Sequence, residues 1–295
     1  MFEIDIFLAD MLFVVKKVFV KFLIPVVLFG LPFVVPVYAV GFDVSTFATI
    51  FSMIFVILVG FFIAAATANY LNLQSHLAEE TAYLIALFSL GVSVQPSMKK
   101  KLGDVIDAYL IAAVDYPLLE YANKTRKELH DVIDVVDSIE VKVSDPKGMV
   151  ALDHLYEAKI SLIKTLHSVA FSAPRVVHRI HWVILTALAS ALVFLLFTLR
   201  TGEVLAGIVI GVLTISLYLV LILLHEVDNN DFLEDSLAYS DVQKVFEAIG
   251  KLKYYPETAF RRYGNDQLQL DKDYRVGIYK DYPKSMEKRI KIVKV

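Results

Sequence analysis

Residues 44–78 read VSTFATIFSMIFVILVGFFIAAATANYLNLQSHLA, and this stretch contains no Asp, Glu, Lys or Arg. A helix needs about 20 apolar residues to cross the ~30 Å of hydrocarbon in a bilayer, and this stretch exceeds that length. Three further charge-free stretches occur at residues 22–42, 182–199 and 204–224. Apolar runs this long and unbroken are typical of helices, which satisfy their own backbone groups in lipid. The sequence therefore predicts an all-α membrane protein with four transmembrane helices in two hairpins and a cytosolic helical bundle.

The composition agrees with a membrane protein and excludes several kinds of chemistry. Of the 295 residues 57% are hydrophobic, the net charge is -3, and there is no Cys. The lack of Cys excludes disulfides, thiolate metal sites and cysteine catalysis. The sequence also contains no Gly-rich phosphate loop, GxSxG or HExxH motif. We therefore expect neither an enzyme nor a nucleic-acid-binding protein.

Basic residues near the ends of the hydrophobic stretches predict the orientation, because Lys and Arg favour the cytoplasmic side. Lys16, Lys17 and Lys21 precede the first stretch, and Arg175 and Arg179 precede the third. We expect a multi-pass protein of the cell membrane with both termini in the cytoplasm. Lysines followed by an apolar run are also typical of a cleaved signal peptide, but the acidic residues ahead of these lysines favour a retained helix.

The hydrophobic stretches divide the chain into four segments. The expected segments are an N-terminal surface segment with the first transmembrane hairpin (1–68), a cytosolic helical domain (69–180), the second transmembrane hairpin (181–225) and a cytosolic C-terminal tail (226–295).

Helical periodicity continues beyond the second hydrophobic stretch, which predicts one helix from about residue 46 to residue 93. Ser97 is the expected cap of the next helix, which Pro117 is expected to kink or end. Further elements are expected as helices at about 118–141 and 149–172, a short helix from Ser240 to Gly250, and a small two-stranded element at 274–279 and 289–295.

A row of apolar side chains within residues 44–78 has the pattern of a pore constriction. Met53, Ile57 and Phe61 recur at steps of four residues, with Gly60 beside them. A hydrophobic neck that gates a pore by dewetting has this pattern, and so does a helix that faces lipid. No charged residue lies within any of the four stretches, which argues against a proton relay or an ion-coupled transporter.

Acidic and amide side chains gather just after the fourth hydrophobic stretch, between Glu226 and Asp235. Hard cations such as calcium take six to eight oxygen ligands from loops of this kind. The candidate calcium ligands are Asp228, Asp231, Glu234 and Asp235. The spacing is not that of an EF-hand, and a solvated connector or a contact with a partner are the alternative interpretations.

Two segments carry a resemblance to a known family. Residues 59–66 (VGFFIAAA) end the apolar part of the second stretch, and residues 79–84 (EETAYL) follow on its polar continuation. Together with a later helix that bears Tyr109 and the second hairpin, this order resembles the bestrophin-like membrane proteins, which are distantly similar to the bestrophin anion channels. The resemblance covers about residues 15–250.

The resemblance implies a passive, anion-conducting ion channel that assembles as a homo-oligomer, with a pentamer favoured. It also implies that the second transmembrane helix lines the pore, with Met53, Ile57 and Phe61 at the neck, and that residues 226–235 correspond to a calcium clasp. The sequence departs from bestrophins at Asn69-Tyr70, where a basic-aromatic signature is expected, and ahead of the acidic run, where Pro-Phe is missing. The alternative is a structural or sensory membrane module that transports nothing. In either case the expected partners are the lipid bilayer and further copies of the chain, with inorganic ions as the cargo of a channel.

Overall fold

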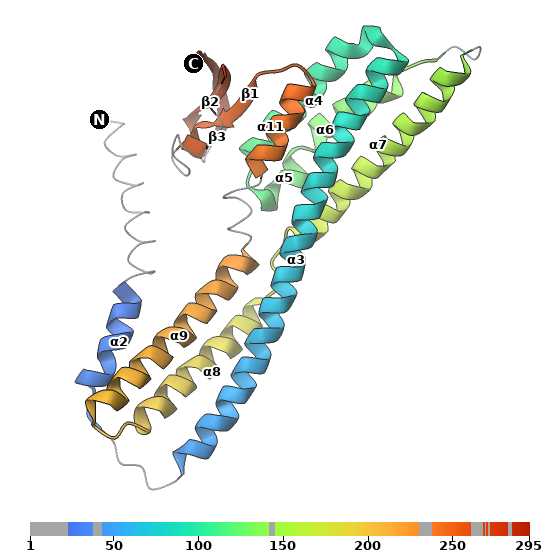
Figure 1. Cartoon of the computed structure of the whole chain (residues 1–295). Coiled ribbons are helices and arrows are strands. Elements are labelled where there is room, and N and C mark those ends of the chain that lie inside the picture. Colours follow the sequence, from blue (N-terminus) through green and yellow to red (C-terminus); the bar gives the residue numbers. More distant parts are fainter. Residues whose placement is uncertain are drawn as a thin grey trace. The chain divides into compact units, whose positions relative to one another are not determined.

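The computed structural model describes residues 23–37, 43–141, 145–229, 238–260, 268, 270, 272–282 and 285–295. This part of the chain is mostly helical, with a three-stranded sheet near the C-terminus (Figure 1). It divides into two compact units, one made of the described residues within 23–66 and 176–229 and the other of those within 67–175 and 238–295. We call the first the apolar unit and the second the polar unit.

The apolar unit supplies the segments that can cross a membrane. Among the described residues three helices are long and apolar enough to do so. They are α3 (Val44–Val94), α8 (Arg179–Thr198) and α9 (Val204–Asp228). The first predicted span, residues 22–42, lies partly outside the described residues, and its described portion forms the shorter apolar helix α2 (Ile24–Val34). A fourth membrane crossing therefore stays a prediction.

Helix α3 is one uninterrupted element of 51 residues, which confirms the helix predicted for residues 46–93. At 1.5 Å per residue it is about 76 Å long, more than twice the thickness of the hydrocarbon core. No Pro occurs between Val44 and Val94, so no residue interrupts the backbone hydrogen bonds. Only the apolar first part of α3 belongs to the apolar unit, and the remainder, from Thr67, belongs to the polar unit.

Asp43 lies immediately before α3 and satisfies the free N–H and hydroxyl groups of its first turn. Its carboxylate accepts hydrogen bonds from the Ser45 N–H at 2.9 Å and from the Ser45 and Thr46 hydroxyls at 2.6 Å each. These hydrogen bonds, led by that from the Ser45 hydroxyl, lower the pKa of Asp43 to about 2. A cap of this kind fixes the residue at which α3 begins.

Helices α2 and α9 pack closely because α9 presents glycines to aromatic rings. A Cβ atom added at Gly211 would lie 2.9 Å from the Phe29 ring, and one added at Gly207 would lie 3.0 Å from the Phe33 ring. Arg200, in the turn between α8 and α9, donates from Nη1 to the carbonyl of Val35 at 2.6 Å and also to that of Pro32. A cation at the C-terminal end of α2 is favoured by the helix dipole.

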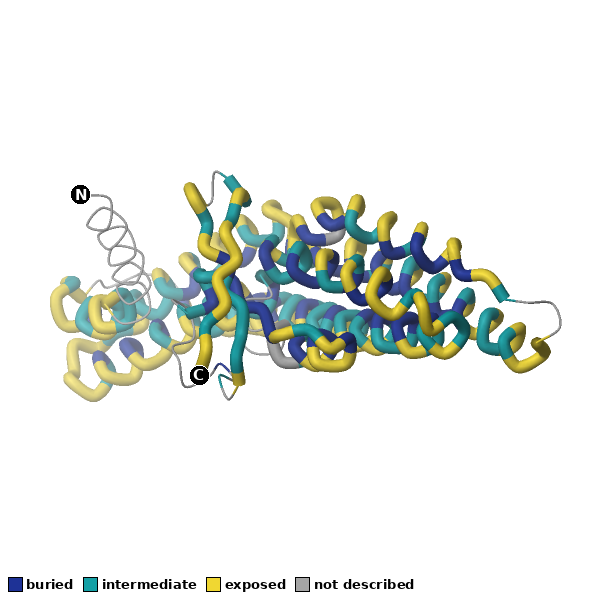
Figure 2. Tube along the Cα trace, turned by 90° about the horizontal axis from the view of Figure 1, so that it is seen from above, coloured by how far each residue is buried: buried dark blue, intermediate teal, exposed yellow. Residues whose placement is uncertain are grey.

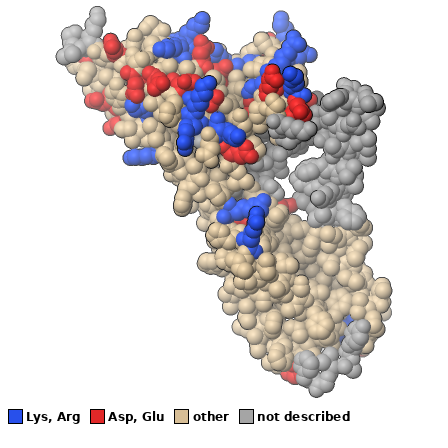
Figure 3. Space-filling model, turned by 180° about the vertical axis from the view of Figure 1, so that it is seen from behind, with Lys and Arg blue, Asp and Glu red and all other residues tan. Residues whose placement is uncertain are grey.

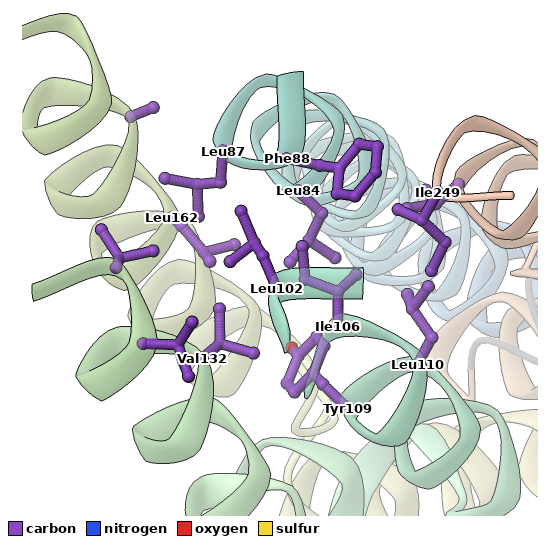
Figure 4. Close-up of a cluster of buried hydrophobic side chains, with 14 of the residues drawn as sticks. Leu84, Leu87, Phe88, Leu102, Ile106, Tyr109, Leu110, Val132, Leu162 and Ile249 are labelled. Carbon is purple, nitrogen blue, oxygen red and sulfur yellow. The ribbon is translucent and has the colours of Figure 1, made fainter. Parts of the chain in front are cut away.

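The polar unit is a bundle of helices around one core. Besides the second part of α3, it contains η2 (Pro96–Met98), α4 (Lys99–Asp115), α5 (Leu118–Lys124), α6 (Arg126–Asp137) and α7 (Pro146–Ser172). In this core Leu84, Leu87 and Phe88 of α3 lie together with Leu102 and Ile106 of α4 (Figure 4). In Figure 2 buried and exposed positions alternate along these helices, as the amphipathic pattern requires.

Two predicted helix boundaries in the polar unit are wrong. Ser97 does not cap a helix, because residues 96–98 form a 3-10 turn and α4 begins at Lys99 without a side-chain cap. The predicted helix at 118–141 is divided at Thr125 into α5 and α6. The hydroxyl of Thr125 donates to the carbonyl of Tyr121, and a side-chain bond of this kind competes with a continuous helix.

The C-terminal tail adds strands to the polar unit. Helix α11 (Ala238–Ala248) is followed by Gly250, whose φ of 74° favours glycine, and then by a sheet with the strand order β1-β2-β3. Strand β1 (Lys253–Pro256) pairs parallel to β2 (Tyr274–Asp281), which pairs antiparallel to β3 (Ser285–Val293). The predicted two-stranded element is confirmed and extended by β1, so a small sheet is added to a mostly helical protein.

The packing of the sheet requires a glycine at position 277. The Tyr254 ring covers Gly277 so closely that a Cβ atom at position 277 would overlap its hydroxyl group. Tyr254 itself is fully buried.

The two units differ in their surfaces. Figure 3 shows many Lys, Arg, Asp and Glu residues over the polar unit and few over the apolar unit on the face in view. A surface with few charges suits hydrocarbon rather than water.

Candidate functional site

The three predicted neck residues lie together on one exposed side of α3. Met53 is 60% exposed, Ile57 67% and Phe61 66%. Phe55 and Val59, on the opposite side of the helix, are buried in the core of the apolar unit against α8 and α9. In the described part of a single chain the neck residues therefore face outward, and their role in a pore stays a prediction.

The exposed side of α3 continues beyond the neck as a regular row. Alternating steps of three and four residues connect side chains that are each at least 43% exposed. We call this row the apolar stripe, and it consists of Phe47, Ile50, Ile54, Ile57 and Phe61. A repeat of about 3.5 residues keeps one face of a helix turned toward neighbouring helices in a supercoiled assembly. The stripe is thus suited to contact with further helices as well as with lipid.

Asp228 has a structural role at the end of α9. Its Oδ1 atom accepts hydrogen bonds from the backbone N–H groups of Val176 and Val177, each at 2.9 Å. The contact ties the end of α9 to the segment that precedes α8. Its Oδ2 atom is buried and has no hydrogen-bond partner among the described residues.

The other predicted calcium ligands, Asp231, Glu234 and Asp235, lie outside the described residues. Within the described part of the chain no group of three His, Cys, Asp or Glu residues is arranged to hold a metal ion. The calcium site therefore stays a prediction, and Asp228 has one carboxylate oxygen already engaged by backbone groups.

The polar unit contains a buried carboxyl group that is not among the predicted site residues. Glu80 of α3 is only 4% exposed and contacts two tyrosine hydroxyls. The Tyr109 hydroxyl lies 2.7 Å from Oε1, and the Tyr121 hydroxyl is in hydrogen-bond contact with Oε2. Burial raises the pKa of Glu80 to about 7, although the hydrogen bonds from the two tyrosines oppose this shift.

The spacing of apolar residues in α3 contains the signal that reveals this burial. Leu73, Leu77, Leu84 and Leu87 follow one another along one side of the helix, and Glu80 falls in the same row. A lone acidic residue within an apolar row is expected to be buried and paired with polar groups. The partners, however, come from helices whose packing the row does not specify.

A second group of carboxylates holds the C-terminal sheet on α4. Asp107 binds the Arg275 guanidinium through two hydrogen bonds of 2.8 and 2.6 Å. Asp115, which is buried, accepts hydrogen bonds from the Tyr254 hydroxyl at 2.8 Å and the Tyr279 hydroxyl at 2.5 Å, and contacts the Lys288 ammonium. These residues lie more than 130 positions apart in the sequence, so their pairing has no local signal.

Comparison with known proteins gives one match. A family model for the bestrophin-like domain matches residues 42–230, which comprise the exposed row on α3, the buried Glu80 and the hairpin of α8 and α9. No curated protein and no solved structure matches the chain. The bestrophin-like domain is typical of channel-like membrane proteins. Because the match covers more than half of the chain, the protein belongs to the bestrophin-like family.

Proposed function

We propose that the protein is a passive, anion-conducting ion channel formed by a ring of identical subunits, with a pentamer favoured and α3 lining the axis. Closure of such a ring follows from head-to-tail contacts between copies. The apolar stripe on α3 is the observation that carries the proposal, because a single chain leaves it uncovered along about four turns of helix. Membership of a channel-like family supports the same assignment.

The pore in this proposal is gated by its apolar lining rather than by charge. Met53, Ile57 and Phe61 form the neck, where a narrow ring of apolar side chains excludes water until it widens. The membrane-facing part of α3 carries no ionisable side chain, as a passive pore permits and an ion-coupled transporter does not. Both termini and the polar unit lie in the cytoplasm, as the basic residues flanking the spans indicate.

Conductance in planar bilayers tests the proposal. The purified oligomer, with its mass verified, is expected to conduct anions. Phe61→Ala widens the neck and is expected to raise the conductance or the open fraction. Phe194→Ala is the matched control. Phe194 lies on α8, away from the stripe, and is about as exposed as Phe61, at 68%, so the two substitutions remove the same side chain at different places.

A verified oligomer that remains silent in bilayers would contradict the proposal, as would equal effects of Phe61→Ala and Phe194→Ala. The alternative is a structural or sensory membrane module that transports nothing. A monomer or dimer in native-like lipid favours that alternative, because one or two copies lack the helices to enclose an axial pore.

Calcium binding after α9 is a further part of the proposal. Calcium is expected to raise the thermal midpoint of the wild type, and Asp231→Ala is expected to remove that increase. Asp228→Ala is expected to lower the midpoint even without calcium, because it removes the acceptor of two backbone N–H groups. If calcium stabilises Asp231→Ala as much as the wild type, the acidic stretch is a solvated connector.

A further inference from the structure

The hydroxyl groups of Tyr109 and Tyr121 and the carboxyl group of Glu80 form a closed ring of contacts inside the polar unit. Besides the two contacts with the carboxyl oxygens, the two hydroxyl oxygens lie 3.0 Å from each other. Tyr109 is fully buried and Tyr121 is 3% exposed. The ring joins α3, α4 and α5, each of which contributes one residue.

The ring has enough hydrogen atoms for all of its contacts only when Glu80 carries a proton. Each of its three contacts needs one hydrogen atom to become a hydrogen bond, and the two tyrosines supply two. With Glu80 ionised, one contact brings two oxygen atoms together without a hydrogen between them. A proton on Glu80 supplies the third. Donation then runs once around the ring, from the carboxyl group to Tyr121, from Tyr121 to Tyr109, and from Tyr109 back to the carboxyl group.

Among the residues that the structure describes, no cation contacts the carboxyl group of Glu80. Within the described part of the chain the tyrosine hydroxyls are the polar groups in hydrogen-bond contact with it. The nearby Thr125 is neutral and donates to the carbonyl of Tyr121. Glu79 turns instead to His76, at 3.6 Å, and to Thr165 of α7, at 3.5 Å.

The other ionisable groups on the surrounding helices are engaged elsewhere or exposed. The carboxylates of α4 contact the tail, and Glu120 and Lys124 of α5 and Lys164 of α7 are exposed. Glu128 of α6 has one buried carboxylate oxygen without a hydrogen-bond partner among the described residues, and it adds no positive charge.

We propose that Glu80, with Tyr109 and Tyr121, is a proton-binding site of the polar unit. The ligand is a single proton, held on the carboxyl group and hydrogen-bonded into the ring. The burial that raises the pKa of Glu80 to about 7 supports the assignment made from the contacts. A proton-binding site of this kind is compatible with a channel and with a non-transporting module. The proposal is therefore independent of whether the protein conducts ions.

Infrared difference spectroscopy of the full-length protein in lipid tests the site directly, because a neutral carboxyl group has its own carbonyl stretch. Between about pH 5.5 and about pH 8.5, the wild type is expected to lose one such band with a midpoint near pH 7. Glu80→Gln is expected to lack that band. Glu79→Gln is the matched control, because it makes the same change at the neighbouring position and is expected to keep the band.

A wild type without a neutral carboxyl band at about pH 5.5 would overturn the proposal, and so would an unchanged band in Glu80→Gln. Should Glu80→Gln fail to fold, Tyr121→Phe decides. It removes one donor to the ionised carboxylate, so the midpoint is expected to rise, whereas Tyr83→Phe, outside the ring on α3, leaves it unchanged. An unchanged midpoint in Tyr121→Phe also overturns the proposal.

Discussion

At Glu80 the folded protein binds a proton more tightly than the unfolded chain does. The pKa of the group rises from 4.5 to about 7 because folding removes it from water. The protonated form therefore favours the folded state, and the free energy of unfolding falls as the pH rises through this interval. The fall is expected to reach about 3 kcal/mol, since one pH unit corresponds to about 1.4 kcal/mol.

Thermal and chemical unfolding at about pH 5 and about pH 8 measure this effect. Glu80→Gln carries no titratable group at the site and is expected to show a much smaller dependence on pH. Glu79→Gln keeps the wild-type dependence, because Glu79 lies on the exposed side of α3. An equal dependence in the wild type and in Glu80→Gln would show that other groups cause the change.

Individual residues show how far sequence reasoning reaches at this scale. The position of Met53, Ile57 and Phe61 on one side of a helix follows from their spacing, and the structure bears out that placement. Asp228 was predicted as a metal ligand from composition, yet its Oδ1 atom accepts from two backbone N–H groups. Hydrogen bonds between distant segments depend on the packing of helices, and the local sequence does not contain that information.

Among the elements, the best predicted is α3. Its length follows from an apolar row without Pro, and the predicted boundaries lie within two residues of those observed. The break at Thr125 was missed because a hydroxyl that bonds to a backbone carbonyl is compatible with a helix as well as with its end. Strand β1 was missed because its partner, β2, follows after an interval and pairs in parallel, which leaves no hairpin signal.

The docking of the C-terminal sheet on α4 gives a prediction at the element scale. The Arg275 and Asp107 side chains are 13% and 14% exposed, so their two hydrogen bonds are shielded from water. A double-mutant cycle with Arg275→Gln and Asp107→Asn is expected to give a coupling energy of about 1–3 kcal/mol. Thermal unfolding of the two single variants and the double variant measures it.

The pair of Lys280 and Glu287 is the matched control for this cycle. It joins β2 and β3, but its side chains are 77% and 71% exposed. Its coupling energy is expected to stay below about 0.5 kcal/mol, because exposed ion pairs are screened by water and salt. Equal coupling in the two cycles would mean that the buried pair does not hold the sheet on α4.

For the whole molecule, the association with a membrane could be predicted from the sequence, because several apolar runs are long enough to cross the hydrocarbon core of a bilayer. The number of subunits could not, because the apolar stripe offers the same chemistry to lipid and to other copies of the chain. Cross-linking can distinguish contact with lipid from contact with other copies. The sequence contains no Cys, so a single introduced Cys is the only thiol in each chain.

Ile57→Cys is expected to cross-link into dimers with a short bifunctional thiol reagent, because a ring brings the stripes of its subunits together around the axis. Leu219→Cys, on the exposed side of α9, is the control and is expected to stay monomeric. Denaturing gels of protein treated in lipid distinguish the two. Cross-linking of Leu219→Cys alone would place α9, rather than α3, at the axis.

The contact between Tyr254 and Gly277 bears on how related chains can diverge. Because the phenol ring fills the space above Gly277, no larger residue is tolerated at position 277 while the ring remains. Homologues that replace the glycine are therefore expected to carry a smaller side chain at the position of Tyr254 as well. If the residues at positions 254 and 277 vary together among homologous sequences, the homologues share the parallel pairing of β1 and β2.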